Sequence, residues 1–463
     1  MLSPLCLRQF SKADILRQTK GILVMRVCCA VLVFICSLAG LVDHDVCVAQ
    51  DSNGEFEELF NGTDLKGWYG LKTIDPRKWN ALSDQGRADL REKASAGTSE
   101  HWSVENGEIV NDGKGPFLVT EREFGDYEME LEYRTVALAE SGVYLKGTPQ
   151  VQIWDFTKAG GKWNIGADKG SGGLWNNRKG MAGKDPLVLA DKPFGEWNKL
   201  RVLQVGARTT VHLNGKLVVD HATMDNFWDR KQPLIQKGPI QLQTHGGEIR
   251  WRNIRARDLK PAEANKILAS HGSDGFEPIF NGKDFSGWQG ATDDYQVVDG
   301  ALMCKPGKGG NLFTEKEYSD FKVRFEFKLP PKGNNGLAVR YPGEGDPAYA
   351  GMCELQVLNA DYPGELDYRQ FHGSAYGMAA AAKGYLRSTG EWNFQEVTVA
   401  GSKIKVELNG SIILDCDLSE VSDYLGDRPH PGKDRKSGYF GFAGHNDPVQ
   451  FRNITAAKVT QEP

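Results

Sequence analysis

The chain repeats itself over most of its length, and this repeat restricts the folds that are open to it. The phrase FEELFNGTDLKGWYG starts at Phe56, and FEPIFNGKDFSGWQG starts at Phe276 with nine of fifteen positions identical. Further pairs recur in the same order, namely WSVENGEIV with YQVVDGALM, GEWN twice, VHLNGKLVVD with VELNGSIILD, and RWRNI with QFRNI. Because such an ordered set does not arise by chance, we expect two copies of one domain. The period is too long for a solenoid, whose repeats span about 20–50 residues.

The shared motifs give the domain boundaries. We expect copy one at residues 55–259, copy two at residues 276–460, and a polar linker at residues 260–275. Copy one carries an insertion within residues 71–100 that has no counterpart in copy two. Each copy is of ordinary domain size, so we expect each to have its own core and to fold by itself.

Alternation of apolar and polar residues predicts an all-β fold. In FKVRFEFKL, which starts at Phe321, and in YEMELEY, which starts at Tyr127, every second residue is apolar. This period of two is typical of antiparallel strands with one buried face. Asn-Gly pairs at 214–215 and 409–410 lie between two alternating runs and suit the positive φ angles of type I′ hairpin turns. Many short strands with regular turn signals favour a β-sandwich or jelly roll in each copy.

Several motifs in combination resemble a known family. ELFNGTDLKGW, SGVYLKG, QVQIWD, GEWN and GPIQLQTHGGEIRWRNI are similar to the DUF1080 family, whose members are described as 3-keto-disaccharide hydrolases or as 3-keto-glucoside lyase and hydratase domains. The resemblance covers both copies. It implies two tandem concanavalin A-like lectin/glucanase jelly-roll sandwiches, which agrees with the alternation. It also implies a saccharide substrate, and specifically a 3-keto glycoside.

Strand alternation places polar residues of copy two on one face. In NNGLAVRY it turns Arg340 away from the core, in CELQVLN it turns Glu354 and Gln356 away, and in YFGFAGH it turns His445 away. If these strands are neighbours, the side chains line one polar face. In a jelly roll the open face of a sheet is where a sugar would lie.

Copy one repeats this pattern with different residues. Lys146 takes the place of Arg340, Gln150 and Gln152 take the places of Glu354 and Gln356, and His245 matches His445. The family pattern resembles Glu-x-Gln-x-x-Asp on the strand that holds these residues. Copy one lacks its Glu but keeps the acid at Asp155, whereas copy two keeps its Glu and has Asn359 in the last place. Strict alternation would turn Asp155 to the core, so we expect it at the strand end or in the loop.

The implied substrate suggests a mechanism. A C3 ketone acidifies the C2 proton, so a base can remove it while a cation stabilises the enolate and the C1 substituent leaves. Water then adds across the double bond, which gives net hydrolysis. We expect Glu354 and His445 to transfer the proton beside Arg340. The remaining candidates are Asp155, His245 and Lys146 as the equivalents in copy one, Gln356, Gln150 and Gln152 as ligands of sugar hydroxyls, and Trp175 and Tyr376, from glycine-rich loops, as stacking residues.

Other interpretations stay open at this point. Outward Glu and Gln side chains are often only solvated, the histidines could bond loop backbone, and Arg340 and Lys146 could be surface charges. A non-catalytic, lectin-like carbohydrate-binding protein is the first alternative function. A conventional glucanase is the second, although alternation yields only one carboxylate, Glu354, where that chemistry uses two. No cofactor is evident, and a divalent metal in the role of Arg340 is an open alternative.

Composition and the first residues bear on location and partners. The net charge of −5 and the absence of a basic patch argue against nucleic-acid binding. Residues 1–49 combine basic residues, an apolar run at 27–42 and the small-residue sequence VCVAQ, which is typical of a cleaved secretory signal whose start is Met1 or Met25. An uncleaved anchor is the alternative, although the run is short for a bilayer. We therefore expect an exported protein, periplasmic or extracellular, without a stable membrane anchor.

This interpretation makes a prediction about the mature chain. Cleavage after Ala49 should give a protein that starts near Gln50. Intact-mass measurement on protein from the native host would test it. A mature chain that retained residues 27–42 would instead support an anchor.

Overall fold

The structure, a computed structural model, describes residues 54–459. The expected signal segment at residues 1–49 lies outside this range. Within the described residues each copy consists of two antiparallel sheets, a larger one and a five-stranded one, whose apolar faces meet. The protein is therefore an all-β pair of jelly-roll sandwiches, as the alternation predicts.

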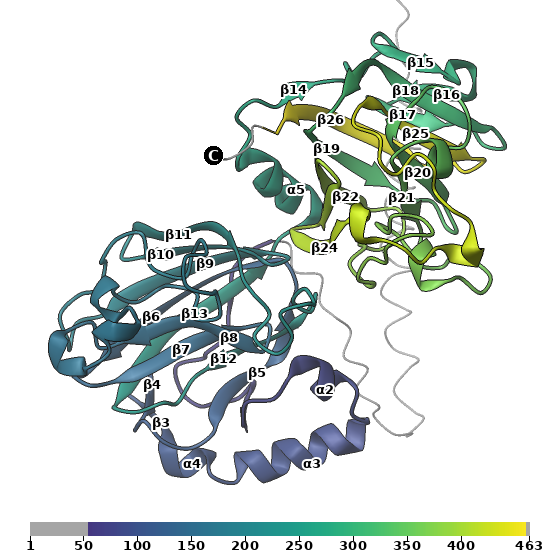
Figure 1. The fold of residues 1–463 in the computed structure, drawn as a ribbon. Helices are drawn as coiled ribbons and strands as arrows, with labels where there is room; N and C mark the ends of the chain where they lie inside the picture. Colours follow the sequence, from purple (N-terminus) through teal and green to yellow (C-terminus); the bar gives the residue numbers. More distant parts are fainter. Residues whose placement is uncertain (1–53, 460–463) are drawn as a thin grey trace, which may run out of the picture. The chain divides into compact units, whose positions relative to one another are not determined.

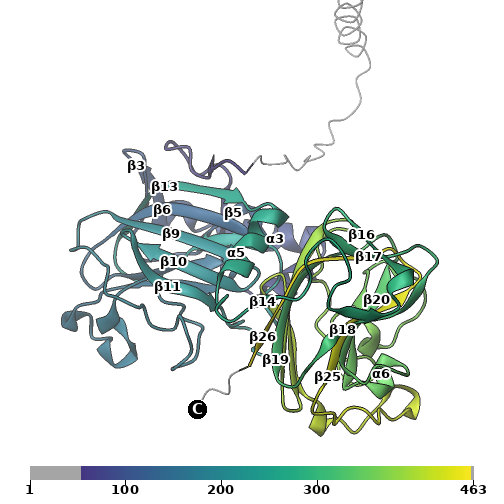
Figure 2. The ribbon, with the colours of Figure 1, turned by 90° about the horizontal axis from the view of Figure 1, so that it is seen from above.

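In copy one the larger sheet has the strand order β11-β10-β9-β6-β13-β4-β3, with β1 paired to β13, and the smaller has the order β2-β5-β12-β7-β8 (Figures 1 and 2). The strands are β1 Glu57–Glu58, β2 Trp68–Leu71, β3 Trp102–Glu105, β4 Glu108–Asn111, β5 Phe117–Phe124, β6 Tyr127–Thr135, β7 Glu140–Leu145, β8 Thr148–Trp154, β9 Asn198–Val205, β10 Arg208–Leu213, β11 Lys216–Thr223, β12 Gly238–Leu242 and β13 Ile249–Asp258.

Copy two repeats this topology strand for strand. Its sheets have the orders β24-β23-β22-β19-β26-β17-β16, with β14 paired to β26, and β15-β18-β25-β20-β21. The strands are β14 Glu277–Pro278, β15 Trp288–Gly290, β16 Tyr295–Val298, β17 Ala301–Cys304, β18 Gly309–Tyr318, β19 Phe321–Lys328, β20 Asn334–Tyr341, β21 Cys353–Leu358, β22 Trp392–Ala400, β23 Lys403–Leu408, β24 Ser411–Asp417, β25 Gly438–His445 and β26 Gln450–Lys458. The matching orders show that the sequence repeat is a structural duplication.

Helices are short and lie between strands. They are α2 Pro76–Asn80, α3 Asp84–Ser95, α4 Thr98–His101, α5 Pro261–Ser270 and α6 Pro347–Ala350, and the 3₁₀ turns are η1 Lys158–Gly160, η2 Trp163–Ile165, η3 Ala167–Lys169, η4 Thr292–Asp294, η5 Tyr368–Gln370, η6 Leu418–Glu420 and η7 Leu425–Asp427. Among residues 54–459 no helix has the length and apolar character needed to cross a bilayer.

Both Asn-Gly pairs form the expected tight hairpins. Asn214 and Gly215 have φ angles of 53° and 78°, and Asn409 and Gly410 have 48° and 80°. Two successive positive φ angles define a type I′ turn, which matches the twist of the strands on either side. These turns fix the register of β10 against β11 and of β23 against β24.

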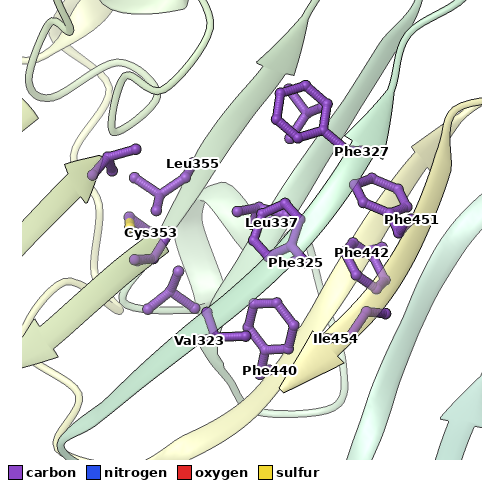
Figure 3. Close-up of a cluster of buried hydrophobic side chains, with 14 of the residues drawn as sticks. Val323, Phe325, Phe327, Leu337, Cys353, Leu355, Phe440, Phe442, Phe451 and Ile454 are labelled. Atoms are coloured by element: carbon purple, nitrogen blue, oxygen red, sulfur yellow. The ribbon is translucent and has the colours of Figure 1, made fainter. Parts of the chain in front are cut away.

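The core of copy two forms where the inner faces of its sheets meet (Figure 3). Phe325 and Phe327 of β19 are fully buried, as are Phe442 of β25 and Phe451 of β26, and the rings of Phe442 and Phe451 stack at 3.9 Å. Each buried aromatic ring of this kind stabilises the fold by about 3–5 kcal/mol relative to alanine. In the smaller sheet, to which β25 belongs, the residues that alternate with the buried ones point to the opposite, outer face, and polar side chains can lie there.

The insertion of copy one covers part of the outer face of its smaller sheet. Helices α2 to α4 occupy it, and Trp79 of α2 packs with Leu71 of β2 and Val119 of β5. The guanidinium of Arg91 on α3 lies 4.2 Å from the ring centre of Tyr69, which also stacks on Trp79. This end of the face is thus apolar and filled in copy one.

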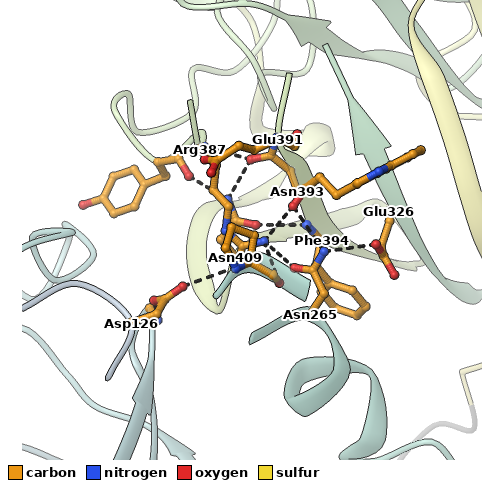
Figure 4. A network of polar contacts seen from close by, with 12 residues as sticks. Asp126, Asn265, Glu326, Arg387, Glu391, Asn393, Phe394 and Asn409 are labelled. Carbon is orange, nitrogen blue, oxygen red and sulfur yellow. Dashed lines mark hydrogen bonds and ion pairs between the residues drawn. The ribbon is translucent and has the colours of Figure 1, made fainter. Parts of the chain in front are cut away.

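The linker contains a helix, α5, that carries a buried polar side chain. Asn265 is 1% exposed, and its Nδ2 atom donates to Oε2 of Glu326 at 3.1 Å and to the carbonyl of Trp392 at 3.2 Å. The guanidinium of Arg387 donates to Oδ1 of Asn265, within a network that extends to Asn409 (Figure 4). Asn265 therefore satisfies a buried carboxylate, a carbonyl and a guanidinium at once.

We predict that Asn265→Ala destabilises the protein by about 1–3 kcal/mol, because truncation leaves buried polar partners without hydrogen bonds. Chemical denaturation of the full chain would measure this. Lys266→Ala, an exposed change on the same helix, is the control and should alter stability by less than about 0.5 kcal/mol. Equal stability of the two variants would show that the network contributes nothing.

Candidate functional site

The outer face of the five-stranded sheet in copy two carries the polar residues that alternation predicts. Gln356 lies opposite Gly336, and Glu354 lies opposite Ala338, across the β20–β21 pair. A Cβ atom at Gly336 would lie 2.1 Å from Oε1 of Glu354, so the glycine provides the space in which this carboxylate lies. His445 ends the neighbouring central strand β25 on the same face.

The side chains of Glu354 and His445 lie close enough together to act as a pair in proton transfer. Nε2 of His445 lies 3.7 Å from Oε1 of Glu354, and the Glu354 side chain is 7% exposed against 46% for the histidine. The nearby Glu354 carboxylate raises the pKa of His445 above its usual 6.5, although burial opposes this rise. A half-exposed imidazole beside a buried carboxylate can take up or release a proton near neutral pH.

Amide side chains surround this pair. Nε2 of Gln356 donates to Oδ1 of Asn334 at 2.7 Å, which fixes the orientation of both amides. The loop after β21 returns to the strand, where the N–H of Tyr376 donates to the carbonyl of Glu354 at 2.9 Å. Nε2 of Gln370 in turn donates to the Tyr376 hydroxyl at 3.1 Å. The loop is thereby held beside the Glu354–His445 pair.

These groups line a pocket of about 330 Å³, the size of a small-ligand site. Three chain segments build its walls: the β20–β21 connection with α6, the long loop after β21, and the loop before β25. The lining residues are Asn334, Asp346, Ala348, Tyr349, Glu354, Gln356, Leu358, Tyr362, Leu366, Gln370, Tyr376, Arg428 and His445. Tyrosines, amides, two carboxylates and one guanidinium are the side chains with which proteins bind and orient sugars.

Arg428 supplies the positive charge of the pocket, and alternation could not have identified it because it lies in a loop. Its guanidinium is 3.4 Å from the ring centre of Tyr349. His430 supports the same tyrosine. Its ring stacks on the ring of Tyr349 with the centres 4.7 Å apart, and its Nδ1 lies 2.6 Å from the carbonyl oxygen of Ala348. Asp346 was missed for the same reason, since it comes from the N-cap of α6.

Arg340 does not line this pocket, which corrects the expectation. The side chain is 1% exposed, and its guanidinium donates to the carbonyls of Ser319 and Gly401 and to Oδ1 of Asp320, each at 2.8 Å. Its φ angle is 45°, and the β20–β25 register shifts between Ala338 and Tyr341. Alternation stops at this irregularity, so the side chain turns to a structural cluster.

Lys146 is corrected in the same way. With φ angles of 53° and 69°, Lys146 and Gly147 form the two-residue turn between β7 and β8, where strand alternation no longer applies. Nζ of Lys146 donates to the carbonyl of Gly206 at 2.8 Å. Burial lowers the pKa of Lys146 to about 8, with Asp126 opposing that change. The shared position of the two cations therefore reflects a shared structural role, an acid–cation–glycine cluster in each copy.

The outer face of copy one has a carboxylate that the sequence argument missed. Gln150 and Gln152 lie there as expected, each 3% exposed and hydrogen-bonded to one another. Glu140 at the start of β7 accepts from Nε2 of Gln152 at 3.1 Å, and its Oε2 lies 2.9 Å from Nδ1 of His245. The signal was present, because Glu140, Gly142 and Tyr144 alternate with residues such as Val143 and Leu145 that belong to the core.

Asp155 is not the partner of His245 on this face. It follows β8, as expected for a residue at the strand end, and is 3% exposed. Its carboxylate accepts from the N–H groups of Leu138 and Thr157, both at 2.8 Å, and from the Thr157 hydroxyl. Burial alone would raise the pKa of Asp155, but these hydrogen bonds lower it overall. The geometry is that of an ionised carboxylate that anchors two loops.

The two loop aromatics occupy equivalent places with different surroundings. The N–H of Trp175 donates to the carbonyl of Gln150 at 3.0 Å, as that of Tyr376 does to Glu354. Trp175 packs edge-on against Trp154, and Nζ of Lys184 lies 4.1 Å from its ring centre. A lysine thus already covers one face of the Trp175 ring, whereas Tyr376 lines a pocket.

The site and fold agree with a family assignment. The family described as the 3-keto-alpha-glucoside-1,2-lyase-like domain matches residues 55–257 and 275–457. The chain belongs to this family, with one match in each copy. The match confirms the family resemblance that the motifs indicate, and it confirms that the resemblance extends over both copies.

Three similar proteins each match less than half of this chain. A 3-keto-disaccharide hydrolase from Bacteroides thetaiotaomicron is 26% identical over 243 aligned positions, and the match covers 43% of this chain and 83% of the relative. A solved structure of a candidate glycosyl hydrolase from Parabacteroides distasonis has 23% identity and a TM-score of 0.36, covering 41% of this chain and 95% of that one. A carbohydrate-binding module from Bacillus subtilis has 14% identity and a TM-score of 0.26, covering 37% and 96%.

The two histidines should titrate in a fixed order. Glu354 raises the pKa of His445, helped by Asp346 and Asp447, whereas burial and the charge of Lys162 lower the pKa of His245. NMR titration of labelled histidines should therefore show His245 losing its proton at lower pH than His445. Glu354→Gln should lower the pKa of His445 and leave that of His245 unchanged. A His445 pKa that does not respond would remove the pair from the site.

Proposed function

We propose that the protein hydrolyses 3-keto glycosides in the pocket of copy two. The single observation that supports this most is the Glu354–His445 pair, at 3.7 Å, inside a sugar-sized pocket of a chain that belongs to this family. The name of the Bacteroides relative points to the same substrate class.

The proposed reaction starts with proton transfer from C2. The pair of Glu354 and His445 takes the C2 proton, and the C2–H electrons move towards the C3 oxygen to give an enolate. When the enolate returns to a ketone, the C1=C2 double bond forms and the C1–O bond to the aglycone breaks. The leaving oxygen receives the proton that the pair holds. Water then adds its hydroxyl to C1 and a proton to C2, which restores a saturated 3-keto sugar. The sum is hydrolysis without a redox step.

The remaining pocket residues have matching roles in this proposal. Arg428 takes the place that was expected for Arg340 and stabilises the enolate oxygen, because a guanidinium lowers the energy of a developing negative charge. Gln356 and Asn334, which are fixed by their mutual hydrogen bond, bind sugar hydroxyls. Tyr376 offers an aromatic face to the apolar side of the ring, whereas the ring of Tyr349 holds Arg428 in place.

Asp346 is the observation that favours a second candidate function, a conventional glycosidase. It is a second carboxylate in the pocket, and such enzymes use two carboxylic acids. However, its Oδ1 atom already accepts from the N–H of Ala348 at 3.0 Å as the cap of α6. A carboxylate that caps a helix is oriented by that structural hydrogen bond, so we place this function second.

We also propose that the chain acts outside the cytoplasm, on the basis of residues 1–49. The basic, apolar and small-residue segments of that stretch follow the order of a secretory signal. Export would place the pocket where saccharides from the environment reach it.

Substrate comparison tests the function. The purified protein is incubated with an aryl 3-keto glucoside and with its unoxidised parent, and release of the aglycone is followed. Release from the keto sugar alone supports the elimination mechanism, because only the ketone acidifies C2. Equal release from both would favour the glycosidase with Asp346. Binding of the keto sugar without release would identify a lectin-like protein.

We predict that Glu354→Gln lowers turnover of the 3-keto glucoside by about 10²–10⁴-fold, the usual effect of removing a general acid or base. The substitution keeps the volume of the side chain, so folding should persist, as judged by circular dichroism. Glu315→Gln, an exposed change on β18 of the same sheet, is the matched control and should retain full turnover. Full activity of Glu354→Gln would place the chemistry elsewhere.

A further inference from the structure

The two copies carry their carboxylate at different positions of the same face. Gly142 lies opposite Gln152, and Gly336 lies opposite Gln356, so the registers of the two strand pairs are equivalent. By this register Gln150 matches Glu354, and Glu140 matches Asn334. Copy one thus has Gln on β8 and Glu on β7, where copy two has Glu on β21 and Asn on β20. The acid has exchanged places with an amide.

In its new place Glu140 gathers three polar partners from separate elements. It accepts from Gln152 of β8, lies 2.9 Å from Nδ1 of His245, which follows β12, and forms an ion pair with Lys162, which precedes η2. The Glu140 side chain is 13% exposed, whereas those of His245 and Lys162 are 53% and 36% exposed. The carboxylate is therefore partly buried beneath an imidazole and an ammonium that solutes can reach.

A second, independent feature of this face is the side chain of Gln243, whose amide contacts the Tyr144 hydroxyl but whose oxygen is unsatisfied. Gln243 is 6% exposed, and its Oε1 atom has no hydrogen-bond partner in the described part of the chain. Its backbone N–H donates to the carbonyl of Gly142 at 2.9 Å, so the residue continues β12 beside β7, two positions before His245. Buried polar atoms are normally paired, and one that is not marks a place where a ligand hydroxyl would gain a hydrogen bond.

The rim of this face is apolar and exposed. Leu138, Trp163 and Ile165 are 66%, 47% and 43% exposed. Asp155 holds the backbone of Leu138, and Nε1 of Trp163 donates to the carbonyl of Phe156 at 3.0 Å, so both rim segments are anchored. Trp163 directly follows Lys162, which places an exposed indole next to the charged cluster. Indole faces of this kind stack on the apolar face of a sugar ring.

We infer that copy one holds a second acid–base centre for a saccharide, in which Glu140 and His245 transfer the proton and Lys162 supplies the positive charge. The inference rests on the proposed function and extends it to a second site. Copy one therefore has the same three parts as the pocket of copy two, namely a carboxylate, an imidazole and a cation, but assembles them from different positions.

The reaction at this centre has the same steps as the reaction proposed for copy two. Nε2 of His245 takes the C2 proton, and the C2–H electrons move towards the C3 oxygen to give an enolate. When the enolate returns to a ketone, the C1=C2 bond forms, the C1–O bond breaks, and the imidazolium returns its proton to the leaving oxygen. Glu140 stabilises the imidazolium through Nδ1, as a carboxylate next to histidine does in other proton-transfer sites. Lys162 stabilises the enolate oxygen. Addition of water to the double bond then completes hydrolysis.

The connection between β7 and β8 differs from its counterpart in copy two. Lys146 and Gly147 join the strands by a two-residue turn, whereas β20 and β21 are joined by residues 342–352 with α6, which form one wall of the copy-two pocket. In copy one Pro76 of α2 lies beside Gly147 instead, so the insertion closes this end of the face.

The test uses the full chain with copy two disabled. Turnover of the aryl 3-keto glucoside is measured for Glu354→Gln alone and combined with Glu140→Gln, His245→Ala or Glu132→Gln. Glu132 is the matched control, because it is also an ion-paired carboxylate of copy one but lies on the larger sheet, away from the proposed centre. Its Oε2 is 2.7 Å from Nε of Arg252 on the same sheet. His245→Ala is a second route to the same loss, since its exposed side chain makes misfolding an improbable cause.

We expect Glu140→Gln and His245→Ala each to lower the turnover that remains in Glu354→Gln by about 10²-fold or more, while Glu132→Gln leaves it unchanged. If wild-type protein is active but Glu354→Gln has no remaining turnover, or if that turnover survives both changes in copy one, the second centre is refuted and the function of copy two stands. If wild-type protein releases no aglycone, the proposed function fails, and the second centre fails with it.

Discussion

The rest of the structure depends on the packing of two antiparallel sheets against each other in each copy. Along every strand that meets the core, one residue of each pair is removed from water, as the buried phenylalanines of β19 show. The other residue of the pair must then point to the outer face. Because a shift by one residue would exchange the two faces entirely, the burial of the apolar set also fixes which polar side chains gather outside. The candidate sites are thus a consequence of core packing.

This constraint explains which parts of the site could be predicted from the sequence. Glu354, Gln356 and His445 lie within regular strands, so the alternation places them correctly on one face. It fails for Arg340 and Lys146 because both have positive φ angles, at a register shift and at a hairpin turn, where alternation does not hold. Lysine and arginine tolerate such angles poorly, and nothing in the local sequence announces them.

Other parts of the site could not be predicted because they depend on contacts that are distant in sequence. Asp346, Tyr349 and Arg428 reach the pocket from two loops whose conformations come from tertiary contacts, such as the hydrogen bond between His430 and the carbonyl of Ala348. Glu140 is different, since it lies in a regular strand. Comparing ESGVYLK with NNGLAVR position by position reveals it from the sequence alone, because the two segments share the same Gly and the same cation.

Duplication helps to explain how the two faces could diverge while the fold stayed the same. The strand order, both type I′ turns and the acid–cation–glycine clusters are common to both copies, and all of them support the sandwich rather than the outer face. A glycine, Gly142 or Gly336, lies under the side chain of Gln150 or Glu354 in each copy and keeps space for either group. With that space preserved, the exchange of an acid and an amide between neighbouring strands changes only which side of the histidine faces a carboxylate. Glu354 approaches His445 through Nε2, and Glu140 approaches His245 through Nδ1, so the ring nitrogen that meets the carboxylate differs between the two copies. The two faces would thus present the imidazole to a sugar from different sides, which is a physical basis for different substrates on one fold.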